Sequence, residues 1–418
     1  MTPRAGRPVA VRPARPPRAG AASSGAERLT VDELLDRLDE DGFPRTGTIV
    51  VGGGCAGLAL GVALAEAQEA VAVVEARTGD RDGRTWCYWD TGQALLPEAV
   101  TRSWGRWEVR TPHGRAVAGD AAHPYRMVRA HDYRAAARAR FAGRPGAHLI
   151  DGVRVSDGAP ATPVSRPPHP RLVDARGGVP QHAVAPGRVL LHQRFVGQWI
   201  RTDRAVFDDT TVTLMDFPGS TATGVRFFYV LPVAPDLALV ECTVFSAAAH
   251  GTEPFRQHIA AYVRQRWGLD DDGWTVEGEE AGSIPMTDAR PLGRARGGVP
   301  VGLRAGIARP STGYAFTRIQ IAARHATEHG VDERGVRDGV RTRMLDAIFL
   351  RFLRDQPERA PEVFLRMFAR LPGPLTVRFL TERASPLDEL RLIGALPKRP
   401  FLRAATTTAV ERLRALGA

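Results

Sequence analysis

The stretch from Thr48 to Glu75 has the clearest pattern of apolar and polar positions in the chain. A short apolar run at 49–51 leads into three glycines, a segment of small residues and a second, β-branched run at 71–74. Short apolar runs bounded by turn residues are typical of buried strands, whereas the longer small-residue segment favours a helix. The pattern therefore predicts a strand, a turn, a helix and a second strand that ends on Glu75.

The glycines in this stretch have the spacing of a dinucleotide-binding turn. Gly52, Gly54 and Gly57 form a Gly-x-Gly-x-x-Gly motif, and Glu75 follows Gly52 by 23 residues. Such glycines allow a tight turn, a close approach of the backbone to a pyrophosphate, and close packing of the helix on the strand. The helix N-terminus favours the phosphates, and the acid can bind ribose hydroxyls. The motif predicts a dinucleotide site, with FAD and NAD(P) both open.

The pattern after this unit indicates a second domain. A strand pair is predicted at 104–118 and a helix at 131–142, and prolines and glycines then interrupt residues 143–190. Within them, the short strand 171–174 either returns to the dinucleotide sheet or forms a hairpin corner. Successive β-rich runs at 191–246 indicate an antiparallel sheet.

The C-terminal part is predicted to be mostly helical. A strand is expected at 301–307 and a helix after Gly313, and their junction is a second candidate for binding an anion. From Met344 to Phe368, apolar residues recur at helical spacing with arginines on the opposite side. This stripe either packs on a protein core or lies on a membrane surface.

Composition narrows the range of functions. The 418 residues contain no run near the roughly 20 apolar residues of a membrane-spanning helix, and the start lacks the apolar core of a signal peptide. Three scattered cysteines, Cys55, Cys87 and Cys242, predict neither disulfides nor a metal site, so we expect a cytosolic protein. A net charge of +11 would favour binding to nucleic acid or to an anionic membrane surface. Because the excess is almost all arginine in a chain rich in Ala, Gly and Pro, we expect no nucleic acid partner.

Glu241 is the strongest candidate for chemistry. In the predicted strand 237–245, both faces are apolar except for Glu241 and, mildly, Thr243. Burial disfavours the charged form of a carboxyl group and raises its pKa, which would make Glu241 a competent general acid. The alternative is a structural pair with a buried arginine, and the strand pattern alone leaves both open.

Five stretches of the chain resemble the flavin-dependent lycopene cyclases in residues, order and spacing. They are VGGGCAGL (51–58), RTWCYW (84–89), TVTLMDF (211–217), FYVLPVAPDLALVECTVFS (228–246), and GSIPMTD with RPSTGYAFTRIQ (282–320). RTWCYW together with RPSTGY is far more specific than the glycine motif. The resemblance spans about residues 46–320, and the first 40 residues lie outside the family pattern.

The resemblance implies an α/β fold of the hydroxybenzoate-hydroxylase type. A Rossmann-like FAD-binding domain would be interleaved with an antiparallel substrate sheet and followed by a helical C-terminus. The expected parts are a disordered extension (1–45), the first part of the FAD domain (46–190), the substrate sheet (191–275), the return of the FAD domain (276–335) and the helical C-terminal region (336–418). A short acidic helix could form at 30–41.

The resemblance also implies cofactors and site residues. The expected FAD contacts are Gly52, Gly54, Gly57, Glu75, Arg84, Gly306, Thr312, Gly313 and Tyr314. The expected substrate contacts are Trp86, Tyr88 and Phe228, although the residues alone favour an aromatic strand in a core for Trp86 and Tyr88. Reduced FAD, with NADPH as the presumed reductant, would act without net redox change.

Catalysis in this family implies a role for Glu241. It would protonate the terminal C1=C2 bond of lycopene, after which the C5=C6 bond closes the ring and loss of the C6 proton gives a β-ring. Plant members have a second acid where this chain has Cys242, which leaves Glu241 alone in that motif. Peripheral membrane binding through the C-terminal helices is expected, because the basic amphipathic stripe from Met344 to Phe368 suits a substrate dissolved in the membrane. The alternatives are a flavin monooxygenase, a prenyl-chain reductase, or a carotenoid-binding protein without activity.

Overall fold

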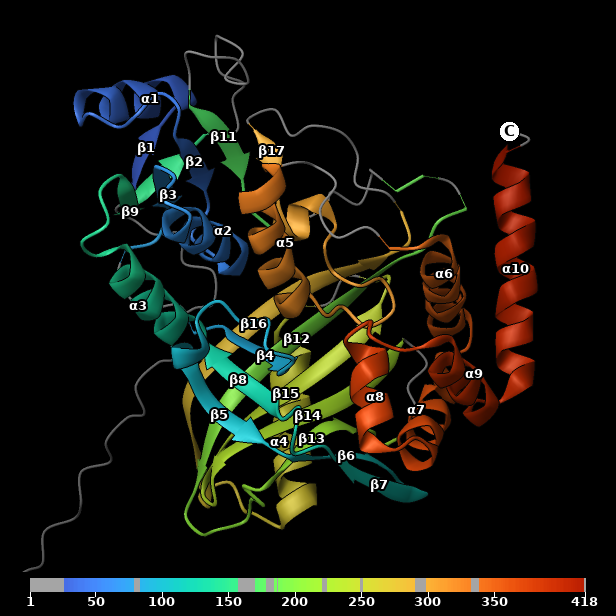
Figure 1. The fold of residues 1–418 in the computed structure, drawn as a ribbon. Coiled ribbons are helices and arrows are strands. Elements are labelled where there is room, and N and C mark those ends of the chain that lie inside the picture. The colour runs from blue at the N-terminus through green and yellow to red at the C-terminus, as the bar shows by residue number, and fades with distance from the viewer. Residues whose placement is uncertain are drawn as a thin grey trace, which may run out of the picture.

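The computed structural model describes residues 26–78, 83–156, 170–177, 184–185, 187–219, 224–248, 251–289, 298–331 and 338–416, and two large sheets carry most of their strands (Figure 1). The smaller of the two is five-stranded and parallel throughout, in the order β17-β11-β2-β3-β9. Its strands are β2 (Thr48–Val51), β3 (Val71–Glu75), β9 (Ala147–Asp151), β11 (Arg171–Asp174) and β17 (Val299–Pro300).

The predicted strand–turn–helix–strand unit is confirmed at the centre of this sheet. Helix α2 (Cys55–Glu66) connects β2 to β3, and its residues from Gly57 to Ala65 are buried. β11 pairs in parallel with β2, so the segment 171–174 returns to the dinucleotide sheet and is not a hairpin corner. Helices α3 (Ala130–Phe141) and α5 (Phe316–His329) pack with α2 on one face of the sheet.

The segment before β2 is folded, which corrects the prediction of disorder for residues 26–45. Helix α1 (Val31–Glu40) begins with a capping box, in which Thr30 Oγ1 accepts from the Glu33 backbone N–H at 3.2 Å. Buried Leu34 and Leu38 pack on the outer face of the parallel sheet, beside the small parallel pair of β1 (Glu27–Leu29) and β10 (Val153–Val155). Residues 1–25 lie outside the described part of the chain.

The second large sheet has seven strands in the order β16-β12-β15-β14-β13-β6-β7, and all neighbours are antiparallel except β6 and β13. The strands are β6 (Arg106–Thr111), β7 (Gly114–Gly119), β12 (Leu190–Thr202), β13 (Thr211–Asp216), β14 (Val225–Ala234), β15 (Leu237–Ser246) and β16 (Trp274–Thr287). Helix α4 (Glu253–Trp267) covers one face. This sheet confirms the predicted antiparallel region.

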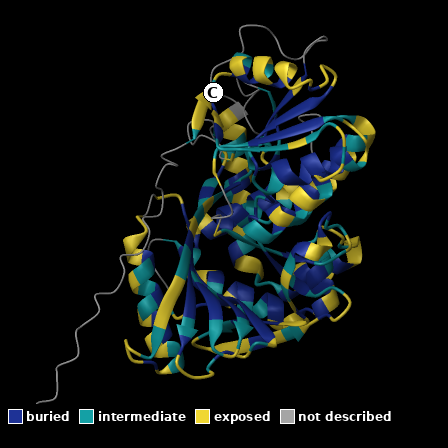
Figure 2. Ribbon diagram, turned by 90° about the vertical axis from the view of Figure 1, so that its left-hand side faces the viewer, coloured by how far each residue is buried: buried dark blue, intermediate teal, exposed yellow. Residues whose placement is uncertain are grey.

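The other face of the seven-stranded sheet is covered by a small sheet and by the C-terminal helices (Figure 1). The small sheet has the order β4-β8-β5, with β4 (Thr85–Trp89), β5 (Val100–Trp104) and β8 (Tyr125–Arg129). The helices are α6 (Val340–Asp355), α7 (Ala360–Arg370), α8 (Gly373–Leu380), α9 (Pro386–Ala395) and α10 (Lys398–Leu416). Most strands are buried, whereas the helices alternate buried and exposed positions (Figure 2).

Single-turn 3-10 helices occur at Pro97–Ala99, Gly302–Ala305 and Pro357–Arg359. The second of these corrects the predicted strand at 301–307. Gly302 and Gly306 have φ values of +63° and +71°, which an extended strand does not contain, so the strand β17 ends at Pro300.

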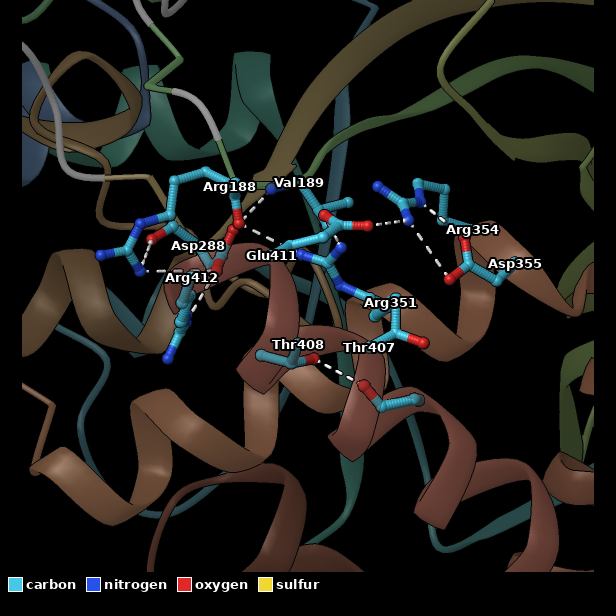
Figure 3. Close-up of polar contacts among 12 residues, drawn as sticks. Arg188, Val189, Asp288, Arg351, Arg354, Asp355, Thr407, Thr408, Glu411 and Arg412 are labelled. Atoms are coloured by element: carbon cyan, nitrogen blue, oxygen red, sulfur yellow. Dashed lines mark hydrogen bonds and ion pairs between the residues drawn. The ribbon is translucent and has the colours of Figure 1, made fainter. Parts of the chain in front are cut away.

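Ion pairs hold α10 in place (Figure 3). The Arg351 side chain of α6 is fully buried, pairs with Glu411 of α10 and donates to the Gly187 carbonyl at 3.1 Å. Arg412 of α10 pairs with Asp288 at 2.8 Å, and that carboxylate also accepts from the Val189 backbone N–H at 2.7 Å. The last helix is thereby fixed to the segments that begin β12 and follow β16.

Candidate active site

The glycine turn between β2 and α2 has the geometry of a phosphate-binding loop. Gly52 has a φ of +112°, and a Cβ at Gly57 would lie 1.8 Å from the Gly52 carbonyl oxygen, so both positions require glycine. A Cβ at Gly54 would meet nothing nearer than the Arg84 guanidinium at 3.9 Å. The loop is therefore open at Gly54, on the side from which a ligand can approach the N-terminus of α2.

A cavity of about 600 Å³ adjoins this loop. Gly52, Gly54 and Glu75 line it, as do the arginines Arg28, Arg77, Arg84, Arg154, Arg176 and Arg304. Glu75 accepts from the Gly53 backbone N–H at 2.8 Å, which ties the end of β3 to the loop. Backbone N–H groups, cationic side chains and an acid at the end of β3 fit the pyrophosphate and ribose of a dinucleotide.

A second, mostly apolar cavity of about 460 Å³ lies between the seven-stranded sheet, β4 and the C-terminal helices. Its sheet side includes Leu214, Phe227, Leu231 and Leu239, and its helix side includes Phe349, Phe364, Met367, Phe368 and Leu392. Ile393 and Leu402 line the cavity and are also exposed, so the cavity opens between α9 and α10. The predicted stripe from Met344 to Phe368 thus packs largely on the core and the cavity rather than on solvent.

Glu241 of β15 faces this apolar cavity. Its strand neighbours alternate as predicted, because Leu239 and Phe245 line the cavity and Cys242 packs under α4. Burial raises the pKa of Glu241 to about 7, and a hydrogen bond from the Thr243 hydroxyl at 2.5 Å opposes that rise. No ion pair to an arginine is among the contacts described for this carboxyl group. Near neutral pH a large fraction of Glu241 is a neutral acid beside apolar surface.

Glu241 belongs to a row of residues that crosses four strands. In register, Gly197 of β12 lies opposite Glu241 on one side and opposite Glu280 of β16 on the other. Tyr229 of β14 lies opposite Glu241 on the far side. Glu280, Glu241 and Tyr229 all line the cavity. Glu280 was not among the predicted site residues, because only the register of β12 with β15 and β16 brings it beside Glu241.

Three tyrosine side chains line the same cavity as Glu241. Tyr125 and Tyr229 form a short hydrogen bond with each other, and both line the cavity with Tyr314. Burial raises the pKa of Tyr314 to about 12 and holds the pKa values of Tyr125 and Tyr229 well above their usual range. These hydroxyls stay neutral at physiological pH and can donate hydrogen bonds.

Of the predicted substrate contacts Trp86, Tyr88 and Phe228, the structure places only Trp86 in the lining of the apolar cavity. Trp86 lines the apolar cavity, and the Arg84 guanidinium lies 5.9 Å from its ring centre, so this pair joins the two cavities. Tyr88 is buried and stacks on Phe316 at 4.5 Å. Phe228 lies on the opposite face of the sheet, where it stacks on Tyr262 of α4 at 4.0 Å, and its neighbour Phe227 faces the cavity instead.

The turn from Arg309 to Tyr314 forms one wall of the apolar cavity. Thr312, Gly313 and Tyr314 line it. Gly313 has a φ of +72°, and a Cβ there would lie 2.6 Å from the Gln193 amide oxygen, so no larger residue fits without displacing it. Gly306 lies elsewhere, in a small pocket between α2 and α5, and does not line the arginine-rich cavity.

The match to known proteins extends over most of the chain. The family model described as "Lycopene cyclase protein" matches residues 48–406. The chain belongs to the lycopene cyclase family. The family match begins at β2, so β1 and α1 lie outside it.

Named relatives agree with the family. The chain is 30% identical over 389 residues to the lycopene beta-cyclase of Paracoccus sp. (strain N81106 / MBIC 01143), a match that covers 82% of this chain and 92% of that protein. It is 30% identical over 252 residues to the lycopene beta-cyclase of Pantoea ananas, where the match covers 56% of this chain and 63% of the relative.

Solved structures support the fold class. A flavoprotein/dehydrogenase from Cytophaga hutchinsonii aligns with a TM-score of 0.53 at 14% identity, covering 88% of this chain and 99% of that chain. A geranylgeranyl bacteriochlorophyll reductase-like protein from Thermoplasma acidophilum aligns with a TM-score of 0.52 at 13% identity, covering 86% and 98%. The lycopene cyclase chain therefore has the predicted fold, a flavoprotein-type α/β domain joined to an antiparallel sheet, with a helical C-terminus.

Two further findings apply to the described residues alone. None of the helices in these ranges has the length and hydropathy that crossing a membrane requires. Within the same ranges, no three His, Cys, Asp or Glu side chains are grouped so that they could hold a metal ion.

Proposed function

We propose that this chain is a lycopene β-cyclase that closes the ends of lycopene into β-rings without net redox change. The observation that carries the proposal is Glu241, an acid with a pKa raised to about 7, on the sheet side of an apolar cavity in a chain of the lycopene cyclase family. A linear polyene end is apolar and matches such a cavity, and its cyclisation begins with protonation of a carbon–carbon double bond.

In this proposal Glu241 is the general acid. Its proton goes to C2 of the terminal C1=C2 bond, and the cation at C1 is attacked by the C5=C6 bond. Protonating an alkene requires an acid placed against the bond and a site from which water is excluded. The aliphatic and aromatic lining supplies the exclusion, and the raised pKa supplies a proton near neutral pH.

FAD is the proposed cofactor, and NADPH the proposed reductant. Gly52, Gly54 and the arginine-rich cavity would hold its pyrophosphate, with Glu75 near the ribose, and the turn at Thr312–Tyr314 would border its ring system. When bound, reduced FAD supplies negative charge that stabilises a developing carbocation. Arg84 and Trp86 lie where the two cavities approach each other and would orient that end of the cofactor.

We further propose that the protein binds membranes peripherally, from the cytosolic side, at the mouth of the apolar cavity. Leu387 and Leu390 of α9 and Leu402 of α10 are exposed, each by more than half. Arg391, Lys398, Arg399 and Arg403 are adjacent in sequence to this apolar face. Apolar side chains among cationic ones favour an anionic bilayer surface. This position would admit lycopene from the bilayer directly to Glu241.

The decisive test is anaerobic incubation of the purified protein with lycopene in anionic liposomes, FAD and NADPH. Cyclisation gives products isomeric with lycopene, whereas a monooxygenase or a reductase changes the mass of the product. Glu241→Gln should retain FAD and lose cyclisation by about 10²-fold or more, the usual effect of removing a general acid. A parent enzyme that yields no isomeric product, or a Glu241→Gln variant as active as the parent, would contradict the proposal.

A further inference from the structure

We propose that Glu280 is the carboxylate that accepts the C6 proton and so fixes the product as a β-ring. This inference rests on the cyclase activity proposed above and assigns the last step of that reaction to a residue of β16. It names a second carboxylate in the cavity, at a position that the acid-bearing strand motif does not contain.

The first support is the position of Glu280 relative to Glu241. Both residues are paired in register with Gly197, one from each neighbouring strand, so both side chains rise from the same face of the sheet. A Cβ at Gly197 would lie 3.3 Å from Glu280 Cγ and 3.5 Å from Glu241 Cβ. The nearest atom to that position is Leu239 Cδ1 at 3.1 Å, so the two acids and Leu239 surround the place where Gly197 has no side chain. Both acids line the same cavity.

The second support is the different environment of each carboxyl group. The Thr85 hydroxyl donates to Glu280 Oε2 at 2.8 Å, from β4 above the sheet. Among the described residues, Glu241 receives a hydrogen bond from Thr243 of its own strand, and Leu239 and Phe245 flank it on the same face. Burial raises the pKa of the Cys87 thiol on β4, and the nearby charges of Glu280 and Glu241 raise it further. The two acids therefore lie under the same part of β4.

A pair of carboxyl groups in unlike environments can take opposite roles, one as acid and one as base. Glu241 gives its proton to C2, the C5=C6 electrons form the C1–C6 bond, and the cation moves to C5. The C6–H bond then breaks toward a Glu280 oxygen, and its electron pair forms the new C5=C6 bond. The reaction leaves Glu241 ionised and Glu280 protonated, and one proton returned to Glu241 restores the starting state with no oxidant or reductant consumed.

The position of the base decides which isomer forms. A C5 cation can lose a proton from C6, from C4 or from the attached methyl group, which gives β-, ε- or γ-rings respectively. The Glu280 carboxylate is held at a fixed position on β16, the strand next to Gly197. It therefore removes the proton that faces it in preference to the other two. Removing that carboxylate should therefore slow the reaction and also change the mixture of ring isomers, which a merely structural role would not do.

The test is conversion of lycopene in anionic liposomes by the FAD-loaded enzyme and its Glu280→Gln variant. We expect a loss of about 10²-fold in rate, with FAD retained and with ε- or γ-rings in the residual product. Glu280→Asp should restore part of the rate and most of the β-ring. If Glu280→Gln gives no product, Glu280→Asp decides: its displaced carboxylate should give a minor share of ε- or γ-rings beside the β-ring, and a β-ring alone would then overturn the inference.

Glu279→Gln is the matched control. Glu279 is adjacent in β16, but its side chain pairs with Arg256 at 2.6 Å and with Gln198 at 2.9 Å, away from the cavity. It should keep the parent's rate and products. A Glu280→Gln variant that makes only β-rings would overturn the proposed proton acceptor. Failure of the parent enzyme to cyclise lycopene would instead contradict the function on which this inference rests.

Discussion

Replacing Glu241 by glutamine should change the pH dependence of stability as well as activity. Burial raises the pKa of Glu241 from 4.5 to about 7 in the folded protein, so the folded state favours the neutral acid. Between these two values the unfolded chain releases the proton more readily than the folded protein does. The parent protein should therefore lose stability as pH rises from about 4.5 to 7 and change little above pH 7 for this group.

The size of the effect follows from the two pKa values. They differ by about 2.5, and each pKa unit corresponds to about 1.4 kcal/mol, so the full cost is on the order of 3 kcal/mol. The cost is about 1 kcal/mol at pH 5 and about 3 kcal/mol at pH 8. Glutamine is neutral at both values and has no such cost. The advantage of Glu241→Gln in unfolding free energy should therefore grow by about 2 kcal/mol over this range.

The assay is urea unfolding of both proteins at pH 5, 6, 7 and 8, at one fixed FAD concentration because bound ligand adds to stability. Glu279→Gln is again the control. The Arg256 guanidinium lowers the pKa of Glu279, so removing that carboxylate should destabilise the protein over the same range. A constant difference between parent and Glu241→Gln from pH 5 to 8 would refute the reasoning. The reaction rate should fall above about pH 7 as Glu241 ionises.

Three further predictions concern the cofactor loop, the membrane face and α10. Gly54→Val should fold but lose flavin absorbance after purification, because its side chain fills the open space at the loop. Leu387→Asp with Leu390→Asp should abolish flotation with anionic liposomes, whereas Val276→Asp, exposed on β16, should not. Glu411→Gln should lower the unfolding free energy by about 2 kcal/mol, because buried Arg351 keeps the Gly187 carbonyl but loses its charged partner. Glu362→Gln, in an exposed pair, should cost under about 0.5 kcal/mol.

The features predicted correctly from sequence are those that depend on the local periodicity of apolar residues. The unit from Thr48 to Glu75 carries its turn, helix and strands in one continuous stretch, so no distant contact is needed to interpret it. The alternation in β15 likewise identifies Glu241 as an acid among apolar strand neighbours, because the strand period fixes which neighbours share its face.

The features that sequence analysis missed depend on partners far along the chain. Glu280 meets Glu241 only through β12, about 80 residues before β16. Strand alternation predicts that Phe227 and Phe228 lie on opposite faces of the sheet, but it does not predict which face carries the cavity. An amphipathic helix pattern does not distinguish a core from a membrane, so α6 and α7 were left ambiguous. The short acidic helix expected at 30–41 does form as α1, whereas the disorder expected for the whole extension is wrong from residue 26 onward.

The order in which the cavity walls are synthesised has a consequence for how the chain folds in the cell. The seven-stranded sheet is complete at Thr287, whereas α9 and α10 begin at Pro386 and Lys398. Until those helices emerge, the apolar residues that will face the substrate are open to water, which makes partly synthesised chains prone to aggregate. Stop codons before α9 should therefore yield insoluble protein rather than a smaller soluble enzyme.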